Sequence, residues 1–288
     1  MAGRLFVVAT PIGNLGDMTH RAVEALRGAD MIAAEDTKAS MTLLDRFDIK
    51  TRLVSNHKFN EKASADYFLA ELQSGKDIAL ISDAGTPCVS DPGSVLVARA
   101  LENNIEVVGI PGACAAVLAL SVSGFDLREF AFSGFFPREN AETKKLGKKL
   151  ESGGVHVFYE SPKRIEKTIE YFGERFPECE LCLCNDLTKK FERIYRGPPA
   201  LVLTQLQNNP NAQKGEYTIV VDLAKIPEKS EGGAPPALSA EATIAEAMVR
   251  RRCTAKEAVK SLAFEGVCGF GKNELYAASL NLKKMFGN

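Results

Sequence analysis

The sequence predicts an α/β protein, with two α/β domains followed by a small helical segment. Its length of 288 residues corresponds to about two domains of ordinary size. From residue 4 to about residue 223, short apolar runs alternate with segments of helical apolar spacing. This alternation is typical of mostly parallel sheets that helices cover on both faces. A stretch rich in proline and glycine then precedes the last helical segments, as expected for a linker.

The first domain is predicted over residues 1–123. Continuous apolar runs predict its strands at 5–9, 31–34, 78–81 and 106–110. Apolar residues at helical spacing predict helices at 19–27, 94–102 and 113–122. Asn60 is a suitable N-cap for one more helix, whose apolar stripe is Ala65, Phe68, Leu69 and Leu72.

The second domain is predicted over residues 124–226. Its strands are expected near 130–135, 155–159, 180–185, 191–196 and 217–223, and its helices near 139–151 and 162–174. Residues 227–238 form the predicted linker, which contains the run Glu231-Gly232-Gly233-Ala234-Pro235-Pro236. Residues 239–288 form a small basic helical domain, in which eight Lys and Arg outnumber five acidic residues.

Composition excludes several classes of protein. The net charge of -1 does not indicate a general polyanion binder, although local basic patches remain compatible with it. No window contains 18 uninterrupted apolar residues, so no transmembrane helix is expected. The apolar run near the N-terminus is too short for a signal peptide and is typical of a first strand. Seven cysteines scattered through apolar segments indicate reduced thiols and a cytoplasmic protein.

Three loops punctuated by glycine and proline follow strands of the first domain. They are the segments 10–17, 82–93 and 111–116. Ligands of open α/β sheets bind outside the carboxyl ends of the strands, and glycine permits close approach of the backbone. The loops therefore predict a ligand cleft at this edge, although each alone could be a tight turn.

Other ligand sites are disfavoured by the motifs. The first strand is not followed by G-x-G-x-x-G, which argues against an ordinary dinucleotide site. The segment 266–273 resembles a phosphate-binding loop, but Asn273 replaces the hydroxyl residue that would hold a metal. Cys179, Cys182 and Cys184 lack a second close pair, so no metal site is expected and a buried strand is favoured. Of the histidines, His57 lies in a polar loop and is the best candidate for a site.

Five motifs occur in order along the chain: V-A-T-P-I-G-N-L-G-D-M-T (8–19), A-A-E-D-T-K (33–38), S-D-A-G-T-P-C-V-S-D-P-G (82–93), F-Y-E-S-P-K-R (158–164) and L-T-K (187–189). Together they resemble the ribosomal RNA cytidine-2′-O-methyltransferases of the tetrapyrrole methylase (class III) superfamily. The resemblance covers residues 4–223 well and the tail more loosely. It implies two α/β domains of the tetrapyrrole methylase type, with S-adenosylmethionine bound in the cleft between them.

The resemblance also implies which residues contact the methyl donor. They are Pro11, Asp83, Ala84, Gly85, Pro87, Val89, Cys114, Ala115, Tyr159 and Glu160. A ribose hydroxyl is weakly acidic, so a nearby base or cation would assist its methylation. The candidates for this role lie in polar loops at the same edge, and each could equally be a structural capping group. They are Glu35, Asp36, Lys38, His57 and Asp91.

The implied substrate is a cytidine ribose in small-subunit ribosomal RNA, within an assembled ribosomal particle, and the implied assembly is a homodimer. Basic segments, such as the run at 250–252, could bind phosphates or could be solvated helix faces. Two alternatives remain open. One is a methyltransferase of the same fold that acts on a tetrapyrrole or another small substrate, and the other is a non-catalytic RNA-binding assembly factor. The first loop, T-P-I-G-N, differs from the glycine-rich G-x-G-P-G loop of tetrapyrrole enzymes.

Overall fold

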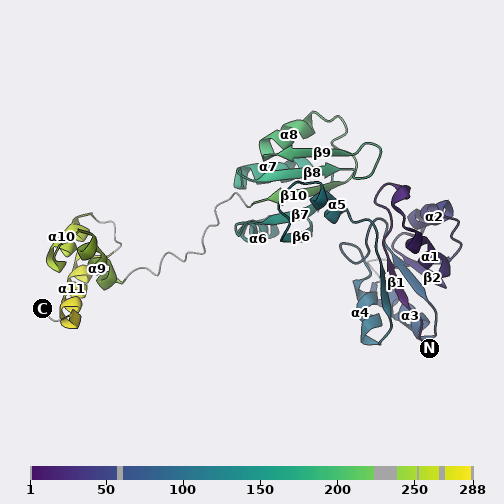
Figure 1. Cartoon of the computed structure of the whole chain (residues 1–288), viewed down its shortest axis with the longest axis horizontal. Helices are drawn as coiled ribbons and strands as arrows, with labels where there is room; N and C mark the ends of the chain where they lie inside the picture. The colour runs from purple at the N-terminus through teal and green to yellow at the C-terminus, as the bar shows by residue number, and fades with distance from the viewer. Residues whose placement is uncertain (1, 57–60, 224–238, 252, 266–269, 287–288) are drawn as a thin grey trace. The chain divides into compact units, whose positions relative to one another are not determined.

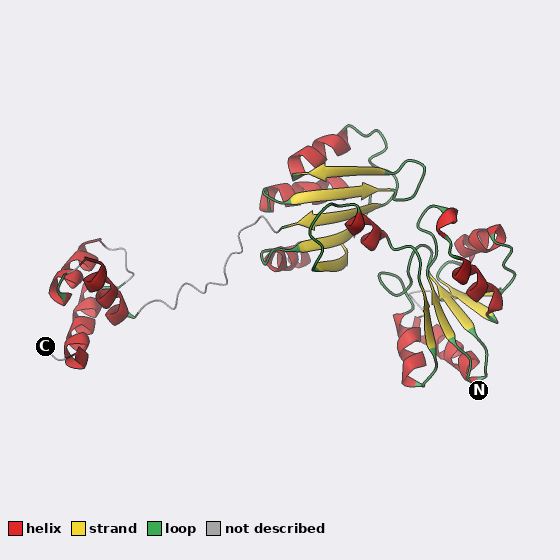
Figure 2. Ribbon diagram, in the orientation of Figure 1, coloured by secondary structure: helices red, strands yellow, loops and turns green. Residues whose placement is uncertain are grey.

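The structure is a computed structural model that describes residues 2–56, 61–223, 239–251, 253–265 and 270–286. The chain divides into two compact units, residues 1–228 and 229–288. The first unit contains two β-sheets with their helices, and the second contains helices (Figures 1 and 2). The predicted fold class is confirmed: the chain is an α/β protein with two sheets, each covered by helices, and a helical C-terminal extension. The predicted linker, 227–238, lies outside the described residues.

The first sheet has five parallel strands in the order β3-β2-β4-β1-β5. The strands are β1 (Leu5–Val8), β2 (Met31–Ala34), β3 (Arg52–Ser55), β4 (Ile78–Ile81) and β5 (Val107–Ile110). Every residue of β2 and β4 is buried, because helices cover both faces of a parallel sheet. The continuous apolar runs that predicted these strands follow from this double burial.

Two pairs of helices cover the faces of the first sheet (Figure 1). They are α1 (His20–Gly28) with α2 (Thr37–Arg46), and α3 (Glu61–Gln73) with α4 (Ser94–Glu102). Phe68 and Leu72 of α3 pack against Leu80, so the predicted stripe of this helix faces the core. Asn60, its predicted cap, lies outside the described residues.

The second sheet is mixed, with five strands in the order β6-β7-β10-β8-β9. The strands are β6 (Phe130–Phe135), β7 (Val155–Glu160), β8 (Glu180–Asn185), β9 (Arg193–Gly197) and β10 (Tyr217–Asp222). Strands β6 and β7 are parallel, whereas β10 runs antiparallel to both β7 and β8. The first residue of β10, Tyr217, therefore lies beside the last residues of its neighbours, Glu160 and Asn185.

Helices cover both faces of the second sheet, and one of them comes from the segment between the sheets. The helices α6 (Asn140–Leu150), α7 (Ile165–Arg175) and α8 (Pro199–Gln207) pack on one face. Helix α5 (Ala115–Ser121) follows the first sheet in the sequence but packs on the other face of the second sheet. Ile12, from the loop after β1, joins the same apolar cluster. These contacts hold the loops of the first sheet against the second sheet.

The second unit contains α9 (Ala240–Arg251), α10 (Ala255–Glu265) and α11 (Lys272–Phe286). Ile244, Val259 and Leu275 are buried in a small core of their own. The predicted phosphate-loop-like segment includes residues 266–269, which lie outside the described residues. Over the part of the chain that the structure describes, no helix combines the length and the apolar character needed to span a bilayer.

Candidate active site

A cavity of about 450 Å³ lies where strand ends of the two sheets meet in the first unit. The first sheet contributes the loops that follow β1, β2, β4 and β5, and the second sheet contributes the ends of β6, β7, β8 and β10. The lining residues are Ile12, Glu35, Asp83, Ala84, Gly85, Thr86, Val89, Ser90, Asp91, Cys114, Ala115, Phe135, Tyr159, Glu160, Ser161, Pro162, Cys184, Leu187, Gly215, Glu216, Tyr217 and Thr218.

The topology of the first sheet explains why the cavity forms at this edge. Strands β1 and β4 are neighbours, but the chain leaves β1 towards β2 on one side and leaves β4 towards β5 on the other. The loops diverge at such a switch point and leave a crevice outside the carboxyl ends of the strands. Thr10 and Gly85 bridge the base of the crevice, with N···O distances of 2.9 and 3.1 Å between their backbones.

The loop after β4 has an unusual backbone. Three of its residues have positive φ, namely Gly85 at 84°, Cys88 at 68° and Gly93 at 129°. Such conformations are costly for residues with a side chain and cluster at ligand sites. At Gly85, an added Cβ would also lie 3.2 Å from Cγ2 of Ile12. The backbone conformation therefore favours glycine here, and an added Cβ would also require the Ile12 side chain to move slightly.

The G85A variant tests this preference. We expect it to lower the stability of the first unit by about 1–2 kcal/mol, because alanine resists positive φ. We also expect weaker binding of the cavity's ligand, because the loop carries much of the wall. G28A is the matched control, since Gly28 has no neighbour within 4 Å of an added Cβ. Thermal unfolding of both variants checks the result, and an equal Tm for G85A and wild type would contradict it.

The direction of β10 explains the wall that the second sheet provides. Parallel strands would bring only carboxyl ends to this edge, as Phe135 of β6 and Tyr159 and Glu160 near the end of β7 do. Because β10 is antiparallel, it instead brings its first residues, Tyr217 and Thr218, to the same edge.

Tyr159 joins the second sheet to the segment that follows β5. Its hydroxyl oxygen accepts a hydrogen bond from the backbone N–H of Ala116 at 3.3 Å. Burial raises the pKa of the Tyr159 phenol to about 12, so the side chain remains protonated at neutral pH. Tyr159 is therefore suited to shaping the cavity, and a role as a base at neutral pH is disfavoured.

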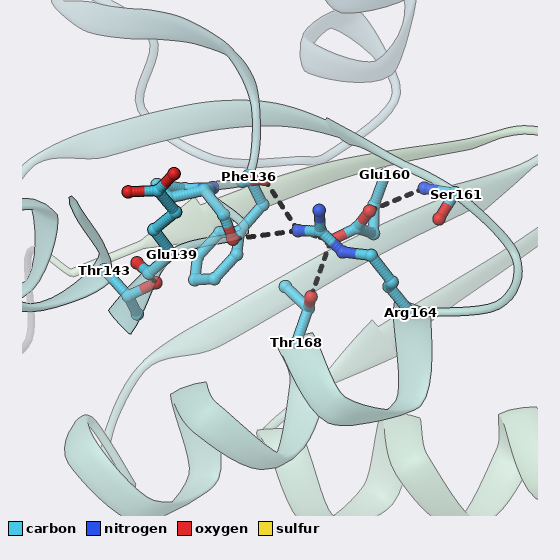
Figure 3. Close-up of polar contacts among 8 residues, drawn as sticks. Phe136, Glu139, Thr143, Glu160, Ser161, Arg164 and Thr168 are labelled. Atoms are coloured by element: carbon cyan, nitrogen blue, oxygen red, sulfur yellow. Dashed lines mark hydrogen bonds and ion pairs between the residues drawn. The ribbon is translucent and has the colours of Figure 1, made fainter. Parts of the chain in front are cut away.

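Glu160 is buried in the cavity wall, and its carboxylate is fully engaged (Figure 3). One carboxylate oxygen accepts from the backbone N–H of Ser161 at 2.7 Å. The other accepts from Arg164 at 2.9 Å and from the Thr168 hydroxyl at 2.7 Å. Arg164 also donates to the carbonyl oxygens of Phe136 and Pro137. This network, which we call the Glu160 network, ties the end of β7 to the segment that follows β6.

Asp91 is a half-buried carboxylate in the cavity wall. Burial raises the pKa of its carboxyl above the ordinary value, and the nearby charge of Asp83 adds to this effect. A hydrogen bond with Ser82 opposes the shift only in part. The neighbouring Ser90 hydroxyl is buried without a hydrogen-bond partner within the described part of the chain. An unpaired buried hydroxyl in a cavity wall indicates a place where a polar ligand can bind.

The structure brings most of the predicted site residues to this cavity. Those in its wall are Glu35, Asp83, Ala84, Gly85, Val89, Asp91, Cys114, Ala115, Tyr159 and Glu160. Pro11 and Pro87 are buried and lie outside the set of residues that line it. Asp36 caps α2 by accepting from the backbone N–H groups of Lys38 and Ala39, and Lys38 itself is exposed. His57 lies outside the described residues.

Asp36 has the structural capping role that the sequence left open as an alternative to a catalytic role. Its carboxylate serves as a helix cap outside the cavity wall, which is the structural role expected for an aspartate before a helix. Its backbone N–H also donates to the Asp83 carboxylate at 3.0 Å, so the loops after β2 and β4 are joined. Of the five predicted catalytic residues, Glu35 and Asp91 line the cavity.

Several wall residues were missed by the sequence-based prediction. Phe135 ends a predicted strand, and Cys184 was interpreted only as part of a buried strand. Residues 215–218 precede and begin a strand, whereas the search considered loops that follow strands. The signal that could have found Ser161 and Leu187 was present, because both lie inside motifs that carried the resemblance.

The cysteines of β8 lie in a buried strand, as predicted. The Sγ atoms of Cys182 and Cys184 are 3.9 Å apart, and both residues are buried. Among the residues that the structure describes, no group of three His, Cys, Asp or Glu side chains is arranged to hold a metal ion.

Comparison with known proteins defines the class. The family model of the tetrapyrrole (corrin/porphyrin) methylases matches residues 4–201, which is more than half of the 288 residues. A solved uroporphyrin-III C-methyltransferase from Thermus thermophilus, in complex with S-adenyl homocysteine, has the same fold. Its TM-score is 0.53 at 14% identity, over 76% of this chain and 97% of that chain. The fold is thus that of the tetrapyrrole methylase class, to which the chain belongs.

Relatives narrow the assignment. A ribosomal RNA small subunit methyltransferase I from Escherichia coli is 38% identical over 280 residues, which cover 96% of this chain and 95% of the relative. The protein of the same name from Pseudomonas aeruginosa is 39% identical over 281 residues, with 97% of each chain covered. The chain belongs to the ribosomal RNA small subunit methyltransferase I family, a branch of the tetrapyrrole methylase class.

Proposed function

We propose that this protein transfers a methyl group from S-adenosylmethionine to the 2′-hydroxyl of a cytidine in small-subunit ribosomal RNA. One observation carries the proposal: a single cavity joins the glycine-containing loops of the first sheet to the half-buried carboxylate of Asp91. The names of the relatives support the RNA substrate. The related C-methyltransferase supports the methyl donor, because its structure was solved in complex with S-adenyl homocysteine.

The residues of the cavity fit the methyl donor. A volume of about 450 Å³ is within the range of small-molecule and cofactor sites. The strained loop at Gly85 keeps the backbone close to the cavity, and the unpaired Ser90 hydroxyl offers a polar partner. The residues that would hold the donor are Asp83, Ala84, Gly85, Val89, Cys114, Ala115 and Tyr159. When bound, the donor supplies an electrophilic methyl group on its sulfonium sulfur. The leaving group is the neutral thioether S-adenosylhomocysteine, which needs no proton to depart.

The chain's own contribution to the chemistry is alignment and proton acceptance. Alignment of a hydroxyl for in-line attack can supply several kcal/mol of the required rate acceleration. In the proposal, an oxygen of the Asp91 carboxylate accepts the proton of the ribose hydroxyl. Burial raises the pKa of this carboxyl, which makes the carboxylate a stronger base than that of an exposed aspartate. The Glu160 network positions the wall opposite the first-sheet loops without taking part in the proton transfer.

The setting of the reaction is part of the proposal. The substrate is the RNA within an assembled small-subunit particle, the protein acts as a homodimer, and the reaction takes place in the cytoplasm. Exposed lysines on α6 offer a surface for RNA phosphates, which contribute affinity that depends on salt. These lysines are Lys144, Lys145, Lys148 and Lys149.

Transfer of a tritiated methyl group tests the proposal. The full chain is incubated with labelled S-adenosylmethionine and small-subunit particles from cells that lack the gene, and the RNA is digested to nucleosides. Label in 2′-O-methylcytidine is the expected result. Label on a base or on another ribose would refute the cytidine-2′-O assignment. Label in an added tetrapyrrole, or binding of RNA without any transfer, would favour one of the two alternatives.

A further inference from the structure

The side chain of Phe135 is a large aromatic group left exposed in the cavity wall. It is 62% exposed, although it ends a strand whose neighbour, β7, is almost entirely buried. Its ring contacts the Tyr159 ring edge to face, with centroids 5.7 Å apart. Tyr159 in turn contacts Phe132 at 5.0 Å, so the exposed ring is supported by two further aromatic rings. This arrangement holds the Phe135 ring in place while leaving most of its surface open.

A local irregularity of β6 sets the position of this ring. The pairing of β6 with β7 shifts register between Phe132 and Phe135. Gly134 lies within the shift and has a φ of 67°, which favours glycine. Bulges of this kind change the direction of side chains and are frequent beside active sites. The irregularity therefore accounts for an aromatic ring that lines the cavity at the end of the strand.

The same irregularity brings β6 close to the loop that carries Asp91. A Cβ added at Gly134 would lie 3.9 Å from the Ser90 hydroxyl oxygen. Phe135 follows Gly134 in the sequence and Asp91 follows Ser90. Both Phe135 and Asp91 line the cavity. The 2′-hydroxyl of a nucleotide is attached to the ribose carbon next to the one that bears the base. If the 2′-hydroxyl lies at Asp91, the base is separated from Asp91 only by the ribose. The base then lies beside the part of the wall that Phe135 forms.

From this geometry we propose that Phe135 is the stacking platform for the base of the target nucleotide, and so a substrate-positioning residue. The inference rests on the proposed function, which it deepens by naming the contact to the substrate base. Enzymes that modify a nucleotide commonly take its base out of the stack and place it against an aromatic side chain. The apolar ring, open on the cavity side and supported from behind, has the chemistry that such a base requires. Stacking is tolerant of the identity of the base, so Phe135 supplies position, and the choice of cytidine comes from other contacts.

Substitution of Phe135 tests the proposal through kinetics. We expect F135A to lower kcat/KM for the RNA particle by about 5-fold to 150-fold, the range measured when a stacking aromatic is removed. The affinity for S-adenosylhomocysteine, measured by calorimetry, should stay within about threefold of wild type, because Phe135 is not among the residues proposed to hold the donor and F135A keeps Tyr159. F135W should keep kcat/KM close to that of the wild type, because tryptophan also stacks on bases. F130A is the matched control: Phe130 begins the same strand, is 50% exposed and is outside the set of residues that line the cavity.

A second readout does not depend on catalysis. The chain contains no tryptophan, so F135W introduces a single tryptophan and F130W provides the control. We expect the substrate particle to quench the fluorescence of F135W and to leave that of F130W unchanged. Failure of the wild type to methylate would contradict the proposed function, whereas the fluorescence would still report stacking.

Three results would overturn the assignment of Phe135. The first is a wild-type kcat/KM for F135A. The second is a loss of S-adenosylhomocysteine affinity of tenfold or more in F135A, because the ring would then belong to the donor site. The third is a changed mass of F135A in light scattering, because the ring would then pack against a second copy of the chain.

Discussion

Replacement of Asp91 by asparagine is expected to lower the rate of methyl transfer by 100-fold or more. General-base catalysis typically contributes a factor of about 100 to 10,000, and the amide of asparagine cannot accept the proton. The affinity for S-adenosylhomocysteine should change by less than about threefold, because the shape of the wall is kept. Single-turnover transfer to small-subunit particles and calorimetry measure the two effects separately. E35Q is the informative comparison, because Glu35 is the other predicted base in the wall.

The pH dependence of the wild-type rate follows from the same carboxylate. Asp91 must be ionised to accept a proton, so the rate should fall as the pH falls through its pKa. Because burial raises this pKa, the fall should begin at a higher pH than an exposed aspartate, with a pKa of about 3.9, would give. The residual activity of D91N should not show this fall in rate at low pH. A large loss in E35Q together with a small loss in D91N would assign the base to Glu35 instead.

The contribution of Asp91 to stability should change with pH in the opposite sense to its contribution to activity. A raised pKa in the folded state means that folding favours the protonated carboxyl. Its contribution to stability is therefore present at low pH and is lost as the pH rises through the pKa of the folded state. Above the pKa of the folded state, D91N removes a charge that burial disfavours, so Tm should be unchanged or slightly higher. A lower Tm would indicate that the loss of activity reflects misfolding.

Replacement of Arg164 by alanine is expected to produce the largest loss of stability. The Glu160 side chain is only 1% exposed, and R164A would leave its charge without the paired cation. Removing one partner of a buried ion pair costs about 3–5 kcal/mol. The carbonyl oxygens of Phe136 and Pro137 would also lose their donor. Urea unfolding at pH 7 measures the free energy of unfolding.

Two further variants separate the charge from the packing. R175A removes a more exposed ion pair at the last residue of α7, with Arg175 42% and Glu151 33% exposed, and should cost less than about 1 kcal/mol. The double variant E160Q/R164A should recover part of the loss, because glutamine leaves no buried charge. A cost below about 1 kcal/mol for R164A would show that the Glu160 network does not hold this wall.

The fold could be predicted where burial imposes a simple pattern. Residues 31–34 and 78–81 are buried on both faces, so their apolar runs match the strands of the structure. Helix α2 was missed because only Ser40 and Leu44 of its ten residues are buried, which leaves no long apolar stripe. Helix α8 was missed as well, although it begins with a proline and three of its residues, including that proline, are buried.

The site could be predicted only in part, for a different physical reason. The loops of the first sheet carry glycine and proline, and these residues signal strained turns such as those at Gly85 and Gly93. The wall of the second sheet consists of strand ends, where no special residue is needed. Tyr217 reaches the cavity because β10 runs antiparallel, and Phe135 reaches it through a shift of register. Strand direction and register depend on tertiary pairing, which local composition does not encode.

The central claim is that the cavity between the first-sheet loops and the ends of the second-sheet strands binds the methyl donor. A crystal structure of the full chain with S-adenosylhomocysteine tests it most directly. The account predicts electron density for the ligand in contact with Asp83, Gly85 and Tyr159, and within reach of the Ser90 hydroxyl. Density for the ligand at any other place on the chain, with this cavity filled by the protein's own side chains, would contradict the account.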